Sequence, residues 1–376
     1  MSTLPTELDD LIVDHLRDNK HALIACALVN KSWLLSSRHR LFEKVILVDD
    51  NSKTFLELAA SPLATFLSCI RSLIDMHSKF FADLLPRLPI FPSLKDLHLH
   101  YIDVNGVSEI ALTQLGAVFP HVTELNVSNT VRFCRLHDLF IIVARFLQLR
   151  RLSIKCSFLQ EDVDAISHHP PVPPALEVVR VHSKPGSDDP FPHIAAWLGA
   201  AQGPSAIRAL ELGLLKRQSL PSVGNLVRML GPDLHALSLN LMYQITTADI
   251  ETHLDLSRNI NLQDLTVHVG LRRLHSPSAH PHATWALLAA PQLSQIKSLT
   301  IVLQIDLIHA VDIFDWARLN TMLGSAPHFS ALQRLRFLVH CPSDHVAGAI
   351  IAQVPMWAEK GIVEVQVTRS GKGFTL

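Results

Sequence analysis

The sequence lacks the features that several classes of protein require. Its five cysteines are scattered and include no CxxC pair, so neither a disulfide framework nor a zinc–cysteine site is expected. No apolar run approaches the roughly 18 residues of a membrane span, and the densest one, 139–144, ends at Arg145. The start, MSTLPTELDD, has neither the basic residues nor the apolar run of a signal peptide. We therefore expect an intracellular protein, cytoplasmic or nuclear, with no membrane partner.

Charge is also scarce. Charged residues make up 18% of the 376 positions, below the roughly 25% that is usual for soluble domains. The 33 lysines and arginines nearly balance the 34 acidic residues, which gives a net charge of −1. Binding to nucleic acid needs a basic excess, so no nucleic-acid partner is expected. Because 48% of the residues are hydrophobic, the chain can bury a large core and is not a disordered protein.

The motifs of common enzyme classes are missing as well. The sequence contains no GxSxG, HExxH, GxxxxGK[ST] or GxGxxG, so hydrolase, protease, nucleotidase and dehydrogenase functions have no anchoring residues. We expect a protein that is not an enzyme and needs no cofactor. The alternative is an enzyme whose site matches no known motif.

Histidine, a common metal ligand, is abundant, with 22 copies. A pair two residues apart on a strand shares one face, but no Cys, Asp or Glu stands at ligand spacing beside the loop groups. We therefore expect solvated histidines and no metal site. The tightest groups are His98/His100, His168/His169 and His275/His280/His282.

One pattern, apolar-x-x-apolar-x-apolar, recurs in ten copies from residue 94 onward. Its middle apolar residues are Leu97, Leu125, Leu152, Val179, Leu210, Leu237, Leu265, Leu299, Leu335 and Val365. Most successive copies are 27 to 31 residues apart, and two steps are 34 and 36. Two weaker copies precede them around Val45 and Leu73, the second with Asp75 in place of its third apolar residue. The alternation within each copy is typical of a short, half-buried strand.

The residue between the two inward positions tests this interpretation. It is polar in every copy: His98, Asn126, Ser153, Arg180, Glu211, Ser238, Thr266, Thr300, Arg336 and Gln366. Helix-period segments such as 134–148 and 221–230 lie between the strands. A strand plus a helix at this period resembles the leucine-rich repeat, whose units stack into a horseshoe with strands on the concave side. The asparagine typical of that family is missing from most copies, and Asn129 comes nearest to it.

The first 42 residues differ from the rest and predict three short helices. Pro5 is suited to a first helical turn, Asn19 can cap the second helix, and Asn30 or Ser32 can cap the third. Three helices of this length make a small core, so they need either a partner or the adjoining repeats. The predicted fold is therefore α/β: a three-helix domain over 1–42 and an irregular βα solenoid over 43–376. An ordinary α/β sheet is the alternative.

The segments LPTELDDLIVDHL, LIACALVNKSW and LF resemble the F-box, a helical motif of similar length. The resemblance, typical of large fungal families, implies docking on the Skp adaptor and, through it, on a cullin of an SCF-type ubiquitin ligase. The residues that match its docking positions are Leu4, Pro5, Leu8, Ile12, Val29 and Trp33. The chain would then be the substrate-recognition subunit for an unknown protein. The alternative is a repeat scaffold unconnected to ubiquitin, whose helices cap the solenoid and turn Pro5, Ile12 and Val29 inward.

If the strands stack in register, their polar residues form one surface, which we predict to bind the substrate. A basic stretch on this surface could accept an acidic or phosphorylated segment. Ordinary solvated strand residues are the alternative interpretation. The candidate residues are His98, Asn126, Arg151, Lys155, Arg180, His182, Glu211 and Arg336.

Overall fold

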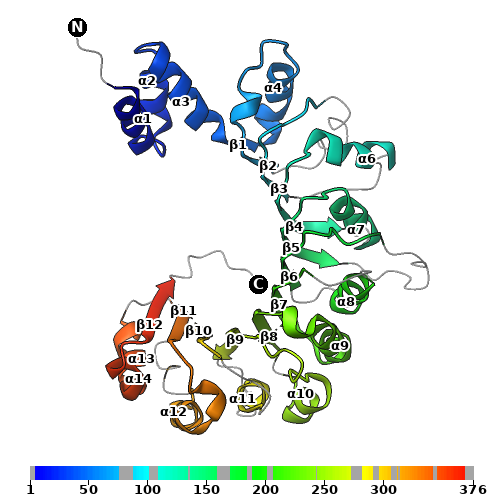
Figure 1. Ribbon diagram of the computed structural model, residues 1–376, viewed down its shortest axis with the longest axis vertical. Helices are drawn as coiled ribbons and strands as arrows, with labels where there is room; N and C mark the ends of the chain where they lie inside the picture. The colour runs from blue at the N-terminus through cyan, green and yellow to red at the C-terminus, as the bar shows by residue number, and fades with distance from the viewer. Residues whose placement is uncertain are drawn as a thin grey trace. The chain divides into compact units, whose positions relative to one another are not determined.

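The computed structural model describes most of the chain and divides it into two compact units, Met1–Leu176 and Glu177–Leu376. Each unit combines helices with parallel strands (Figure 1). The described residues are 5–75, 88–100, 109–133, 136–158, 170–183, 189–200, 206–242, 244–271, 282–290, 296–305, 311, 314–341 and 345–368. The boundary predicted after residue 42 stays a prediction.

The first unit begins with helices α1 (Thr6–His15), α2 (Lys20–Ala27) and α3 (Lys31–Glu43). Pro5 is the residue before α1. Asn19 caps α2 by accepting from the Ala22 amide at 3.1 Å, and Asn30 caps α3 by accepting from the Trp33 amide at 2.9 Å. Each side-chain oxygen satisfies an amide that has no partner within its helix, which explains why the helices start at these residues.

Parallel strands and helices follow in the first unit. They are β1 (Lys44–Leu47), α4 (Asp49–Ala59), β2 (Ser72–Asp75), β3 (Asp96–His100), α6 (Glu109–Val118), β4 (Glu124–Phe133), α7 (Leu136–Ala144) and β5 (Arg151–Phe158). Each strand pairs with the next one in the sequence. Figure 1 shows α4, α6 and α7 on one side of these strands. Among the described residues no helix covers the opposite side, which we call the open face.

The second unit repeats the same alternation. Its elements are β6 (Val178–Ser183), α8 (Phe191–Gly199), β7 (Ala209–Leu215), α9 (Leu220–Leu230), β8 (Ala236–Leu241), α10 (Thr247–His253), β9 (Asp264–Leu271), α11 (His282–Ala289), β10 (Ser298–Ile305), α12 (Trp316–Ser325), β11 (Arg334–His340), α13 (Val346–Gln353), α14 (Pro355–Glu359) and β12 (Val363–Thr368). Here too the strands pair in sequence order, with the helices on one face (Figure 1). We call the other face of these strands the open face of the second unit.

The predicted strand registers are confirmed within both units, except at the last strand. Leu97 pairs with Leu125 and Leu125 with Leu152 in the first unit. The marker residues of β6 to β11 align in the same way in the second unit. The inward residues are buried from β3 to β5 in the first unit and from β6 to β11 in the second, whereas the three valines of β12 are half-buried. Asp75, at an inward position of β2, is also buried.

The register predicted for β12 is wrong by two residues. Leu335 pairs with Val363 rather than Val365, so Glu364 and not Gln366 lies opposite Arg336. Three valines alternate along this strand, and a shift of two residues keeps all of them on the same face. The apolar pattern is therefore equally compatible with both registers. Gly361 lies two residues before β12 begins at Val363, and its φ of 69° makes a left-handed turn that favours glycine.

Candidate functional site

Polar contacts hold α1 against α3. Ser32 Oγ donates to Asp9 at 3.1 Å, Ser36 donates to Asp10, and the Arg40 guanidinium contacts Asp14 Oδ1 at 2.6 Å. The acidic side of α1 therefore faces α3, and the apolar residues on the rest of α1 are left uncovered. The buried apolar residues of the three helices are few: Val13, Leu23 and Cys26.

The helices expose an unusual number of large apolar side chains. Leu8 is 44% exposed, Ile12 38% and Val29 63%. Pro5 is also exposed and Trp33 is half-buried, while Leu4 lies outside the described residues. We call the exposed set the N-terminal apolar residues: Leu8, Leu11, Ile12, Ile24, Leu28, Val29, Leu34 and Leu35.

On the open face of the first unit, a polar cluster surrounds the Asp96 carboxylate. Ser72 Oγ donates to Asp96 Oδ2 at 3.0 Å, His98 Nε2 lies 2.9 Å from the same oxygen, and Asn126 Nδ2 donates to Oδ1 at 3.3 Å. Burial acts to raise the pKa of Asp96, but these hydrogen bonds and the His98 charge outweigh it and hold the pKa below its usual value. The structure therefore joins two predicted residues, His98 and Asn126, through one carboxylate.

Each predicted arginine of the open face is paired with a glutamate from the next or preceding strand. Arg151 contacts Glu124 Oε2 through Nε at 2.8 Å and Nη2 at 2.7 Å. In the second unit, Arg336 contacts Glu364 Oε2 at 3.0 and 2.9 Å. The predicted Lys155 is exposed on β5. An acidic segment that binds these arginines would have to displace a glutamate from each.

In the second unit, Glu211 contacts two other residues of the predicted substrate-binding surface. Arg180 Nε lies 3.2 Å from its Oε2, and His182 Nε2 lies 3.1 Å from its Oε1. The hydrogen bond from His182 is the main reason why the pKa of Glu211 lies below its usual value, despite partial burial. A Cβ atom at position 213 would lie 2.5 Å from His182 Nδ1, so Gly213 leaves the space that this histidine occupies.

The sequence prediction missed His268, which lies two residues after the polar position of β9. Burial lowers its pKa to about 4; Glu211 opposes this shift, while His182 and His340 reinforce it. Its Nε2 lies 3.4 Å from Ser238 Oγ. The corresponding position of β6, two residues after its central polar residue Arg180, is the predicted His182. The same spacing on β9 would have indicated His268.

Among the described residues, no group of three or more His, Cys, Asp or Glu side chains is arranged to hold a metal ion. Of the predicted histidine pairs, His98 contacts Asp96 and Asn126, whereas His100 contacts Ser128. The loop groups lie outside the part of the chain that the structure describes, apart from His282 at the start of α11. No helix in the described ranges has the length and apolarity needed to cross a membrane.

Comparison with known proteins gives a likeness in structure only. No protein-family model matches the sequence, and no curated protein matches it. The structure is similar to that of the leucine-rich repeat-containing protein LegL7 from Legionella pneumophila, with a TM-score of 0.49 and 14% sequence identity. The alignment covers 83% of this chain and 98% of LegL7. At this level, the likeness establishes neither a family nor a function.

The environment of His268 leads to a prediction about acid stability. Because its folded pKa of about 4 lies below the ordinary value of 6.5, the unfolded state binds more protons between these values. The resulting stabilisation is complete above pH 6.5 and is lost as the pH falls toward 4. For a single histidine, the loss at pH 5 is about 2 kcal/mol. The free energy of unfolding of the full chain can be measured in urea at pH 7 and at pH 5. Between these two values it should fall by about 2 kcal/mol less in His268→Asn than in the wild type. An equal loss in both proteins would contradict the assigned pKa.

Proposed function

We propose that the protein is a non-enzymatic interaction subunit that docks on the Skp adaptor of an SCF-type ubiquitin ligase through α1–α3 and holds a protein substrate on the open face. The observation that carries this proposal is the exposure of the N-terminal apolar residues. The identity of the partner rests on the F-box resemblance of the same helices.

Polar contacts contribute to holding the helices together. Polar contacts from Asp9, Asp10 and Asp14 join α1 to α3, and Leu28 is 84% exposed at the end of α2. Burying one such side chain in a partner groove contributes about 1.5–3 kcal/mol. Several together provide the apolar anchors that helix-in-groove recognition requires.

The alternative of a solenoid cap predicts the opposite exposure. A cap would bury Pro5, Ile12 and Val29 against the repeats, whereas all three are exposed. This difference favours a docking role for the helices over a purely internal one. A repeat scaffold unconnected to ubiquitin would need another partner for the same side chains.

The proposed substrate surface is supported by its polar character and by its uncovered position. The open face of each unit presents carboxylates, imidazoles and guanidinium groups that are held in place by cross-strand contacts. Side chains that are ordered before binding lose less conformational entropy when a partner binds. Such a surface suits recognition of a folded or extended polypeptide by hydrogen bonds and matched charges.

The docking proposal is tested with Leu8→Ala combined with Val29→Ala. Because both side chains are exposed, the variant should keep its fold, as checked by circular dichroism and thermal unfolding. The Kd for purified Skp adaptor, measured by calorimetry, should rise by about a hundredfold through the loss of about 3 kcal/mol of apolar burial.

A matched control removes two exposed leucines outside the helices, Leu63→Ala with Leu147→Ala, and should bind like the wild type. If the Leu8/Val29 variant binds as tightly as the wild type, this interface is not the docking site. If the wild-type chain does not bind the adaptor, the scaffold alternative is favoured.

A further inference from the structure

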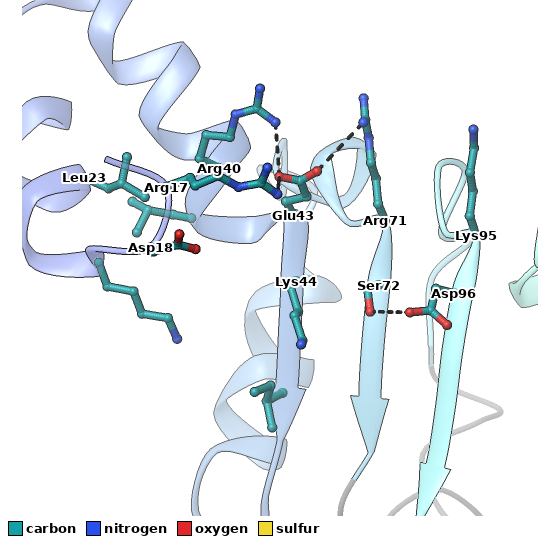
Figure 2. A pocket seen from close by; sticks show the side chains of 13 residues that line it. Arg17, Asp18, Leu23, Arg40, Glu43, Lys44, Arg71, Ser72, Lys95 and Asp96 are labelled. Carbon is teal, nitrogen blue, oxygen red and sulfur yellow. Dashed lines mark hydrogen bonds and ion pairs between the residues drawn. The ribbon is translucent and has the colours of Figure 1, made fainter. Parts of the chain in front are cut away.

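An open pocket of about 580 Å³ lies in the first unit, where the N-terminal helices meet the first three strands (Figure 2). Its wall comes from the α1–α2 connection, the end of α3, and the starts of β1, β2 and β3. Six lining side chains carry positive charge: Arg17, Lys20, Arg40, Lys44, Arg71 and Lys95. For a chain with a net charge of −1, this is a pronounced local excess.

The acidic residues of the pocket neutralise only part of this charge. Glu43 contacts Arg40 at 3.1 Å and lies 3.9 Å from both Arg17 and Arg71, and Figure 2 shows these three side chains extending toward it. Arg40 is fully engaged, because it also contacts Asp14 at 2.6 Å. Asp96 is occupied by Ser72 and His98, and Asp18 adds the remaining negative charge.

Five of the cations therefore keep donors available for a ligand. Lys20, Lys44 and Lys95 have no ion-pair partner among the described residues. Arg17 and Arg71 each reach Glu43 with one nitrogen at the limit of an ion pair, and their side chains are 60% and 54% exposed. On the open face, by contrast, each predicted arginine is closely paired with a glutamate.

From this arrangement, we infer that the pocket binds a compact anion that carries several phosphate groups. Guanidinium and ammonium groups are the side chains that bind phosphate most strongly, and several around one pocket suit several phosphates. The volume lies in the range of roughly 300–1,000 Å³ that is usual for small-molecule sites. None of the described residues that line the pocket is aromatic, so they offer a nucleobase no ring to stack on. The site is independent of the proposed docking function.

The probe is tripolyphosphate, titrated calorimetrically into the full chain. Arg71→Gln combined with Lys95→Gln should raise its Kd at least tenfold, because two charge-assisted contacts are lost. Lys53→Gln combined with Arg258→Gln makes the same change in net charge at two exposed positions outside the pocket and should leave the Kd unchanged. Glu43→Gln should lower the Kd severalfold, because it removes a carboxylate from among the arginines, and it provides a test if the double variant does not fold.

Several outcomes would overturn the inference. Equal weakening in the control variant would show that overall charge, not the pocket, attracts the anion. Orthophosphate binding as tightly as tripolyphosphate would exclude a multi-phosphate site, and tighter binding of an oligoglutamate peptide would favour a polypeptide ligand. ATP binding much more tightly than tripolyphosphate would show that a base is recognised. Since none of these variants alters the N-terminal apolar residues, capture of the Skp adaptor should be unaffected, and the two proposals can fail separately.

Discussion

The substitution Gly224→Ala is expected to destabilise the second unit by more than about 3 kcal/mol, since added volume at a site that cannot relax has a large cost. Gly224 lies on the buried side of α9 where this helix meets the end of α10. A Cβ atom there would be only 1.8 Å from the His253 carbonyl oxygen and 2.9 Å from its carbonyl carbon. Both are backbone atoms, so the helices must separate. For about 200 residues, the midpoint of thermal unfolding should fall by about 10 °C.

A second helical glycine provides the control for this prediction. Gly348, in α13, has no atom within 4 Å of the position that a Cβ would take. Alanine is favoured over glycine in a helix by about 0.5–1 kcal/mol, so Gly348→Ala should be neutral or slightly stabilising. Similar losses of stability in the two variants would show that the effect at position 224 does not come from the contact between α9 and α10.

The second large effect is expected at Asn259, between α10 and β9. Its side-chain amide is buried and donates to the Val227 carbonyl at 2.9 Å and the Gly231 carbonyl at 2.8 Å. These carbonyls lie at the end of α9, where backbone acceptors lack partners within the helix. Asn259→Ala leaves both without this donor, and each unmade buried hydrogen bond costs about 1–3 kcal/mol. The free energy of unfolding, measured in urea, should therefore fall by about 3 kcal/mol.

Asn261 makes a similar contact two residues later and serves as the matched control. Its side chain donates to the Pro232 carbonyl at 2.9 Å, but the site is exposed, so water can replace the donor. Asn261→Ala should lower the stability by less than about 1 kcal/mol. Equal losses for the two variants would mean that burial is not what makes the Asn259 contact important.

The repeated strands could be predicted because their signal is local and recurs. An apolar residue at every second position buries one face of a strand, and repetition at 27 to 31 residues fixes which residues lie opposite each other. Leu210 and Leu237 pair as their spacing predicts. At β12 the same reasoning failed, because three alternating valines fit two registers equally well, and the turn at Gly361 together with the end of α14 determines where the strand begins.

The candidate site was predictable only in part. The sequence identifies His98, Arg151 and Arg180 as exposed strand positions, and the structure places them on the open face. The sequence does not show that Glu124 pairs with Arg151 or that Glu211 pairs with Arg180, because these contacts join residues 27 and 31 positions apart. The basic pocket likewise depends on lysines and arginines from five separate segments, none of which is basic enough to be noticed by itself.

The sequence by itself determined the α/β repeat, the strand registers within each unit up to β11 and the caps of the second and third helices, because each depends on periodicity or on neighbours within one turn. Tertiary structure alone decided which charges are paired, that the N-terminal apolar residues stay exposed, and that cations collect where helices meet strands. These properties follow from distances between side chains far apart in the chain. Electrostatic free energy depends on such distances and on burial, neither of which composition or spacing specifies.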